Sequence, residues 1–241
     1  MVDNNKILLV ITGCLNPVKD QKYLIISNVN VRINQYYQSI DYYIRYTTIK
    51  NIVFCENSGY ECAITPKLNK TASLFNKNFE YLSFRGDSSL VTRYSNKGIG
   101  EDEIMNYICN NSKLYKEIEI ITKVTGRLIL RNIDQLLKNI DYNNYFYQDL
   151  YRGKDREALD TRFYIILKET YESRIRNCYS GISDYTICYE KVFYQLLHPY
   201  YCQLPEYMHF EGVSAGNGID YSEINKYRIK IFDFMPADSQ L

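Results

Sequence analysis

The chain has 241 residues, 46% of them hydrophobic and 24% charged, a composition that suits a folded core and excludes a disordered or fibrous protein. A formal net charge of only +1 gives no electrostatic basis for binding nucleic acid, so an anionic ligand would have to be held by a local group of cations. Seven cysteines without a Cys-x-x-Cys pair, no signal-peptide pattern and no apolar run of membrane-spanning length together predict a cytoplasmic protein.

Strands are predicted wherever a short apolar run ends in a polar turn. Residues 7–11, 52–55 and 79–84 form such runs in the first part of the chain. Between the first two, apolar side chains recur every three or four residues over 30–46, which is the spacing of a helix with one buried face. At 96–115, two glycines and then three acids precede an apolar pattern, which predicts a helix with its acids at the positive end of the dipole.

Strands and helices continue to alternate in the second part of the chain. The pattern predicts, in order, a strand over 118–124, a helix over 133–140, a strand over 160–167, a helix over 185–197, and a last strand with a tail over 225–241. This alternation is typical of an α/β fold with a mostly parallel sheet flanked by helices on both faces. We find no repeat and no linker, so residues 1–241 are expected to form a single domain.

Polar residues end three of the predicted strands, at Thr12-Gly13, Glu56-Asn57-Ser58 and Thr125-Gly126-Arg127. Ligands of such sheets bind outside the carboxyl ends of the strands, so these ends predict one shared crevice. Glu56, Asn57 and Ser58 would meet a ribose or a base there, although on the residues alone an Asn-Ser-Gly turn chosen for its backbone geometry is the better explanation.

Lys-Val-Thr-Gly-Arg, residues 123–127, is an unusual end for a buried strand. Lysine supplies a point charge, arginine a planar fork that grips two phosphate oxygens, and glycine allows a close approach to the backbone. These residue types suit a diphosphate or a sugar carboxylate. The alternative is an edge strand whose Lys123 and Arg127 face water and whose Gly126 forms a bulge.

Glu190 is the candidate general base. On a helix over 185–197, capped by Asp184, it would lie on the apolar face, and burial raises the pKa of a carboxyl group. The alternative is a structural Glu at the edge of the core. His198 and His209 are too isolated from other ligand types to form a recognised metal site.

Two further segments are candidates for binding a donor molecule. Glycine recurs at Gly212, Gly216 and Gly218 in a segment that also carries Ser214, and such a loop can close over a substrate with its N–H groups on a phosphate. Its alternative is a plain connecting turn. Arg162, at the start of a predicted strand, would either reach the crevice or cap an edge.

Several stretches taken together resemble small bacterial GT-A-like glycosyltransferases that are encoded in O-antigen and capsule loci. The resemblance runs from about Leu8 to Tyr221 and rests on ITGCLNP, YYQSIDYYI, IVFCENSGY, NKGIGEDEI, KVTGRLILRN, DTRFYIIL, a late Glu-bearing helix and GVSAGNG. It implies a single-domain GT-A-like (Rossmann-like) fold that moves a sugar from a nucleotide-sugar donor to a glycan or lipid-linked acceptor. It also implies peripheral contact with the inner face of a bacterial membrane.

The chain departs from these enzymes at one important place. Such enzymes commonly hold a divalent metal through an Asp-x-Asp motif after a central strand, where this chain has Lys-Val-Thr-Gly-Arg. We therefore expect no metal and no cofactor: Lys123 and Arg127 would stabilise the leaving phosphate and Glu190 would be the base. The remaining substrate-binding candidates are Thr12, Gly13, Glu56, Asn57, Ser58, Thr125, Gly126, Arg162, Gly212, Ser214 and Gly216.

Two other classes of protein fit the same pattern. A non-catalytic nucleotide- or glycan-binding subunit needs the crevice but no positioned base. Another small α/β enzyme, such as a nucleotidyltransferase or a methyltransferase, needs a different arrangement around the nucleotide, and the usual glycine-rich first loop of a methyltransferase is missing here.

Overall fold

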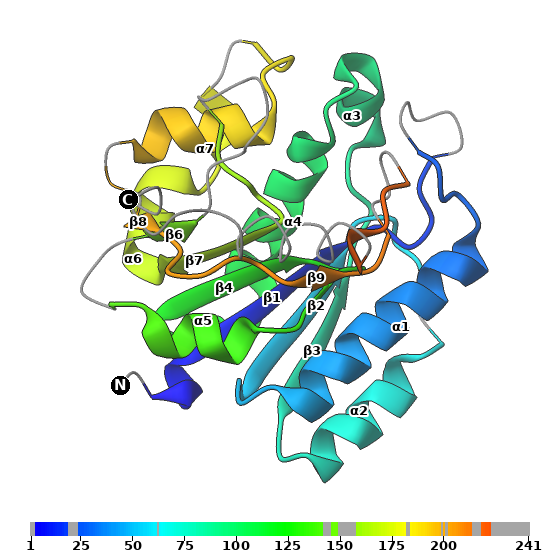
Figure 1. The fold of residues 1–241 in the computed structure, drawn as a ribbon. Coiled ribbons are helices and arrows are strands. Elements are labelled where there is room, and N and C mark those ends of the chain that lie inside the picture. Colours follow the sequence, from blue (N-terminus) through cyan, green and yellow to red (C-terminus); the bar gives the residue numbers. More distant parts are fainter. Residues whose placement is uncertain are drawn as a thin grey trace.

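A central sheet lies between two layers of helices in the computed structural model (Figure 1). The structure describes residues 3–18, 24–61, 63–141, 146–148, 158–181, 184–198, 200, 202–213 and 218–222. Within them no helix has both the length and the apolar character needed to cross a membrane. The strand and tail expected at 225–241 lie outside the described residues.

The sheet has seven strands in the order β3-β2-β1-β4-β7-β6-β8. The first four are parallel, whereas β7 runs antiparallel to β4 and β6 antiparallel to β7. A separate antiparallel pair joins β5 to β9. The bounds are β1 Ile7–Gly13, β2 Asn51–Glu56, β3 Asn78–Ser83, β4 Ile120–Thr125, β5 Ile129–Leu130, β6 Phe146–Gln148, β7 Phe163–Leu167, β8 Cys202–Gln203 and β9 Phe210–Glu211.

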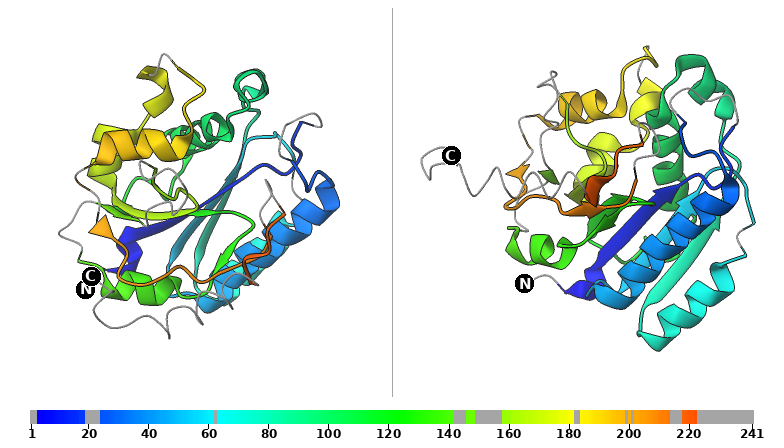
Figure 2. Two further views of the ribbon diagram at one scale, coloured as in Figure 1. Left: turned by 45° about the horizontal axis from the view of Figure 1, so that its top comes forward. Right: turned by 45° about the vertical axis from the view of Figure 1, so that its right-hand side comes forward.

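The helices cover both faces of the sheet, as Figure 2 shows most clearly. One face carries α1 (Val29–Tyr46), α2 (Thr65–Leu74) and α5 (Ile133–Asn139). The opposite layer contains α3 (Ser88–Tyr94), α4 (Lys97–Asn111), α6 (Lys168–Thr170) and α7 (Tyr189–Leu197). Short helical turns complete the described chain: η1 (Asn4–Lys6), η2 (Tyr171–Ile175) and η3 (Cys178–Gly181).

Strand β1 shows why the sheet is covered on both sides, since all seven of its residues are buried. Alternate side chains of a strand point to opposite faces. Leu9 and Ile11 accordingly pack in the core beneath the α1 layer, while Leu8 and Val10 pack in the core beneath α4 and α7. A strand that is apolar on both faces is stable only at the centre of a three-layer fold.

The structure confirms the α/β class, the mostly parallel sheet and the helices on both faces. Two expected helix starts are wrong. Asp184 accepts hydrogen bonds from Thr186 and does not cap a helix, because α7 begins at Tyr189 after Cys188. For the helix expected over 96–115, the two glycines, Gly98 and Gly100, were expected before its start but lie inside α4. This helix begins at Lys97 because the Asn96 side chain accepts from the N–H of Gly98.

Candidate active site

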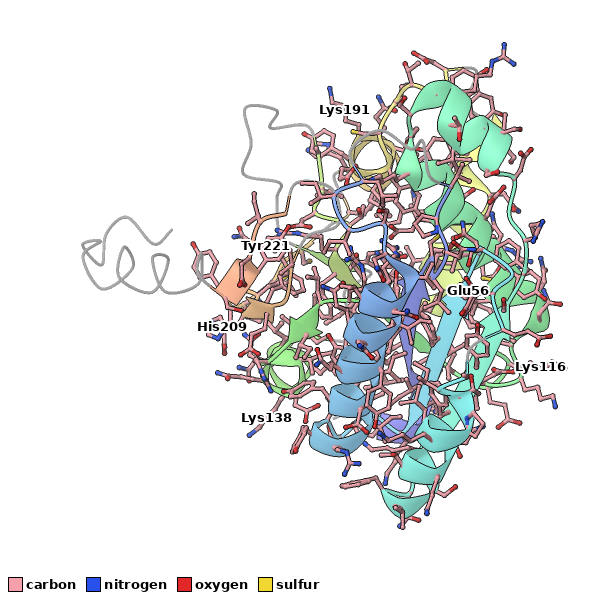
Figure 3. The ribbon with its side chains drawn as sticks, turned by 90° about the vertical axis from the view of Figure 1, so that its right-hand side faces the viewer. Glu56, Lys116, Lys138, Lys191, His209 and Tyr221 are labelled. Carbon is pink, nitrogen blue, oxygen red and sulfur yellow. The ribbon has the colours of Figure 1, made fainter. Side chains whose placement is uncertain are left out.

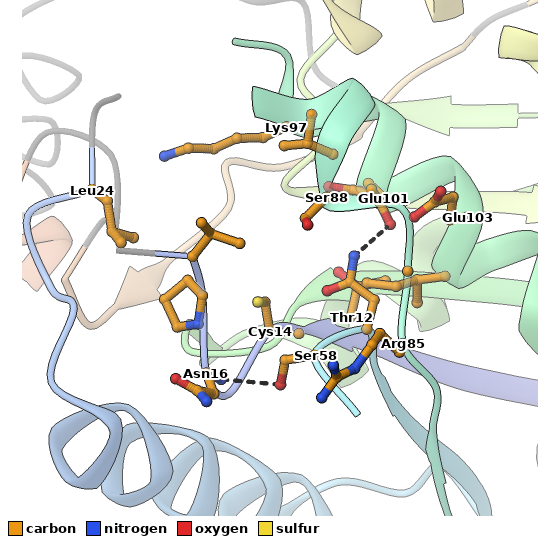
Figure 4. A pocket seen from close by; sticks show the side chains of 18 of the residues that line it. Thr12, Cys14, Asn16, Leu24, Ser58, Arg85, Ser88, Lys97, Glu101 and Glu103 are labelled. Atoms are coloured by element: carbon orange, nitrogen blue, oxygen red, sulfur yellow. Dashed lines mark hydrogen bonds between the residues drawn. The ribbon is translucent and has the colours of Figure 1, made fainter. Parts of the chain in front are cut away.

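A cavity of about 530 Å³ opens at the carboxyl ends of the parallel strands (Figure 4). Its volume is typical of a site for a small organic ligand. Of the expected substrate-binding residues and catalytic cations, Thr12, Gly13, Asn57, Ser58, Thr125 and Arg127 line it. The three polar strand ends therefore do meet in one crevice.

Glu56 builds the floor of this crevice and does not line it. Its carboxylate is fully buried at the end of β2, in contrast to Lys116 and Lys138, which project from the surface (Figure 3). It accepts hydrogen bonds from the backbone N–H groups of Ser58 and Tyr60, both at 2.9 Å, and from two serine hydroxyls. Both carboxylate oxygens are thus used to hold the turn after β2 in shape, so this geometry does not support the expected contact with a ribose.

Gly126 is required by packing between strands. A Cβ atom at this position would lie 2.5 Å from the carbonyl oxygen of Thr12 and 2.7 Å from the Tyr36 ring. The Gly126 N–H donates to that same Thr12 carbonyl at 2.9 Å, and Ser39 of α1 donates to the Gly126 carbonyl. The glycine thus brings the ends of β1 and β4 together, and it directs the next residue, Arg127, into the cavity.

Arg32 of α1, Lys97 of α4 and Arg127 after β4 form a group of three cations that line the cavity, and Arg85 lines it beside Ser58. Burial lowers the pKa of Lys97, and the charges of Arg32 and Arg127 lower it further. Burial also lowers the pKa of Arg127; Tyr36 opposes this effect and the charge of Arg32 adds to it. The three charges are therefore close enough to repel one another.

The two arginines of this group are buried beside neutral partners. Arg32 is 4% exposed and donates to the carbonyl oxygens of Cys14 and Ile26. Arg127 is 6% exposed and donates to the side-chain oxygen of Gln35 at 2.9 Å. Within the described part of the chain neither arginine forms an ion pair with a carboxylate, so the cavity carries an uncompensated positive charge at this end.

The wall beyond Arg85 carries several groups that suit hydroxyl or amide partners. Asp87 and Ser88 follow β3, and the N–H of Asp87 donates to Glu103 of α4 at 3.2 Å. Asn57 donates to the carbonyl of Gly100. In Figure 4, Lys97 extends from α4 along the rim toward the segment that holds Leu24, while Glu101 and Glu103 lie on the α4 side.

Lys123 lies beneath the cavity and does not line it. Its side chain is 0% exposed and points to the α4 face of the sheet, where its ammonium group is paired with the carboxylate of Glu101. It also donates to the carbonyl of Thr161 at 2.6 Å and to the hydroxyl of Thr125 at 3.4 Å. These contacts use all three N–H donors, so this geometry does not support the expected contact with a phosphate.

Glu190 lines a second, smaller cavity of about 280 Å³, between the start of α4 and the start of α7. Burial raises the pKa of Glu190, and the negative charges of Glu101 and Asp160 raise it further, whereas a hydrogen bond from Thr161 lowers it. The candidate base is therefore not in the same cavity as Arg127. Lys97 and Glu101 line both cavities, which adjoin at the first two turns of α4.

The remaining candidates have structural partners or lie outside the described residues. Arg162 is paired with Asp160 and packs over the rings of Phe210 and Tyr221, at 5.2 and 4.8 Å, and it lines neither cavity. Gly212 has a φ of +109°, and a Cβ there would lie 2.8 Å from the carbonyl oxygen of Arg127, so it supports the turn that carries Arg127. Ser214 and Gly216 lie outside the described residues.

The residues at the end of β4 do not fit a divalent metal. The side chains there are Lys123, Thr125 and Arg127, and cations repel a metal ion. Across the described residues no group of three or more His, Cys, Asp or Glu side chains is arranged to hold one. Glu101 and Glu103 come nearest in type, but Glu101 is already ion-paired with Lys123 and Glu103 accepts from the backbone of Asp87.

Sequence reasoning missed Arg32, Lys97 and Glu101. A signal was present for Arg32, since it falls four residues before Tyr36 on the apolar face of the predicted helix over 30–46, where a charge needs a reason. The prediction that the acids of this segment, Glu101 among them, lie at the positive end of the helix dipole is wrong, because α4 begins four residues before Glu101 and its first turn contains no acid.

Comparison with known proteins adds information on the fold. No family model and no curated protein sequence matches the chain. The apo form of the glycosyltransferase GlyE of Streptococcus pneumoniae is similar in structure, with a TM-score of 0.54, 11% sequence identity and coverage of 83% of this chain but only 45% of GlyE. The chain thus spans less than half the length of that protein.

Two weaker similarities have TM-scores below 0.5 and carry no functional argument. A cytidylyltransferase of Leptospira borgpetersenii matches at a TM-score of 0.46 and 12% identity, covering 96% of this chain and 98% of that one. An active-site mutant of LgtC matches at 0.49 and 8% identity, covering 82% and 72%. The similarity to GlyE shows that the fold is GT-A-like, as the resemblance in sequence implies.

Proposed function

We propose that the protein is a glycosyltransferase that moves a sugar from a nucleotide-sugar donor to a glycan or lipid-linked acceptor. One observation carries this proposal: two buried guanidinium groups, Arg32 and Arg127, line the cavity at the carboxyl edge of a GT-A-like sheet without a carboxylate partner among the described residues. A buried and unpaired charge is costly, and a bound phosphate would compensate for it.

In this proposal the donor phosphates lie against Arg32, Lys97 and Arg127. The nucleoside then extends toward Asn57 and Ser58, whose polar groups suit a ribose or a base. Preorganised cations stabilise negative charge as it develops on the leaving phosphate, because they do not need to reorient during the reaction. This replaces the expected role of Lys123 with contributions from Arg32 and Lys97.

The acceptor hydroxyl lies in the second cavity beside Glu190. Its oxygen attacks the anomeric carbon of the donor sugar and the bond from that carbon to the phosphate oxygen breaks. The hydroxyl proton passes to the Glu190 carboxylate, and the nucleotide leaves with the bonding electron pair. A carboxyl group with a raised pKa is a stronger base once ionised than an exposed one.

The biological setting follows from the sequence resemblance alone. We propose that the acceptor belongs to bacterial surface-polysaccharide synthesis, in the cytoplasm and at the inner face of the membrane. The cations at the end of β4 further support a reaction that needs no divalent metal.

A panel of nucleotide sugars tests the proposal. Thermal shift and calorimetry on the wild-type protein should select one nucleotide together with one sugar, and release of the nucleotide should depend on an added saccharide acceptor. Release of pyrophosphate from a nucleoside triphosphate and a sugar phosphate would instead identify a nucleotidyltransferase. Binding without any turnover would identify a non-catalytic subunit.

Chelation tests the proposed metal independence. Transfer should continue at the same rate in excess EDTA after dialysis against the chelator. Activity that disappears under these conditions and returns with manganese or magnesium would contradict it.

A further inference from the structure

Lys123 and Glu101 form an ion pair for which fold stability gives little reason. Lys123 is entirely buried, and both Val124, the next residue of the strand, and Val10, its partner in β1, are apolar core residues. Removing a lysine from water has a large desolvation cost, and a well-packed hydrophobic residue in the place of a buried ion pair is often neutral or stabilising. The pair therefore needs an explanation beyond packing.

Glu101 lies at the boundary between the two cavities. It belongs to α4 and lines both of them. Its Oε1 atom is buried against the ammonium group of Lys123, yet the side chain as a whole remains 22% exposed. One side of the carboxylate is thus fixed from beneath the cavities, and the rest of the group is accessible from them.

The position of this carboxylate matches the point of transfer. If the donor occupies the larger cavity and the acceptor the smaller one, the anomeric carbon must lie where the two meet. Glu190, the proposed base, feels the charge of Glu101, and Thr161 touches both Lys123 and Glu190. The two carboxylates, the lysine and Thr161 form one connected polar cluster below this junction.

We propose that Glu101 contacts the transferred sugar and that Lys123 is a positioning residue that holds Glu101 there. The inference rests on the proposed function. The Glu101 carboxylate accepts hydrogen bonds from sugar hydroxyl groups and so orients the anomeric carbon between the cavities. It also places negative charge beside the positive charge that develops on the sugar as its bond to phosphate breaks, while the cations act on the phosphate.

The test compares Glu101→Gln with Glu172→Gln. Glutamine at position 101 keeps an oxygen that accepts from Lys123 but removes the negative charge. Glu172 is a matched control because it is also ion-paired, to Arg176, is 29% exposed, and lines neither cavity. We expect Glu101→Gln to lower kcat by about 10²-fold or more while the Kd for the free nucleotide changes less than about twofold, and Glu172→Gln to leave both unchanged.

Lys123→Met tests the positioning role through a double-mutant cycle. If Lys123 acts through Glu101, adding Lys123→Met to Glu101→Gln should lower kcat little further, although Lys123→Met alone lowers it strongly. A purely structural role of Lys123 would lower the unfolding temperature and leave the kcat of the folded Lys123→Met variant close to that of the wild type. Because Lys123→Met can fail to fold, Glu101→Gln alone decides the role of Glu101.

The outcomes separate this inference from the proposed function. A wild-type protein that turns over no nucleotide sugar refutes both. A wild-type protein that transfers sugar while Glu101→Gln retains kcat within about threefold refutes only the role of Glu101. Full additivity of the two substitutions refutes only the positioning role of Lys123.

Discussion

Replacing Arg127 by methionine should separate ligand binding from stability, because the two are expected to change in opposite directions. The substitution removes a guanidinium that is 6% exposed and lies close enough to Arg32 for their charges to repel. It also removes the hydrogen bonds of the guanidinium to the Tyr36 hydroxyl and to Gln35, which is only partly buried and can bind water instead. In the ligand-free protein the loss of repulsion and of a desolvated charge offsets the lost hydrogen bonds, so the unfolding temperature should stay the same or rise.

Donor binding should weaken substantially in the same variant. A hydrogen bond to a charged group contributes about 1.5–3 kcal/mol, which corresponds to about a 10- to 150-fold loss of affinity. At a nucleotide-sugar concentration of 100 times the wild-type Kd, the ligand stabilises the wild-type protein by about 2.7 kcal/mol and the variant by about 0.3–1.4 kcal/mol. For a chain of this size the ligand-induced thermal shift then falls from about 5–11 °C to about 1–6 °C.

Arg131→Met is the matched control for this experiment. Arg131 lies four residues further along the chain, is 45% exposed, pairs with Glu211 and lines neither cavity. Its replacement should leave the Kd for the donor unchanged in calorimetry. If Arg127→Met binds the donor as tightly as the wild type, the phosphate does not lie against Arg127. If the ligand-free variant loses several degrees of stability, the guanidinium has a structural role that outweighs its repulsion with Arg32.

Two further predictions concern the base and the glycine at the end of β4. The pKa of Glu190 is raised and a base works only when ionised, so kcat/KM should rise with pH through an acidic limb that lies above the ordinary glutamate range. Glu190→Gln should abolish that limb. An unchanged pH profile in the variant would assign the limb to another group. Gly126→Ala should lower the free energy of unfolding by about 1–3 kcal/mol in urea denaturation, because its Cβ would lie 2.5 Å from the Thr12 carbonyl oxygen; an unchanged midpoint would show that the two strands separate freely.

The order of the elements could be predicted from the sequence because burial leaves a local pattern. Strand β1 is apolar on both faces, and α1 repeats its buried residues Tyr36, Ile40, Tyr43 and Ile44 at helical spacing. The direction of β7 could not be predicted in this way. An apolar strand has the same composition whether it runs parallel or antiparallel to its neighbour, and here β7 pairs antiparallel with β4.

The candidate site could be predicted only where its residues are close in the sequence. Polar strand ends identified the crevice because parallel strands bring their carboxyl ends to one edge. The partner of Lys123 could not be found, since Glu101 lies 22 positions earlier on a helix whose rotation about its axis depends on packing. The same reason hid the division of the crevice into two cavities, because α4 and α7 come together only in the folded chain.

The two cations of Lys-Val-Thr-Gly-Arg have different roles because the strand ends between them. Lys123 is still within β4, so strand alternation points it to the α4 face and into contact with Glu101. Arg127 follows the turn at Gly126, which is free of that alternation and is held to β1 and α1 by the Thr12 carbonyl and the Ser39 hydroxyl. In the proposed reaction the ion-paired Lys123 therefore holds the Glu101 carboxylate toward the sugar, where positive charge develops. Arg127, which has no carboxylate partner among the described residues, attracts the negatively charged phosphate. Exchanging the two residue types would disrupt both arrangements, because arginine is too large for the closed site beneath α4 and lysine lacks the planar fork that grips two oxygens.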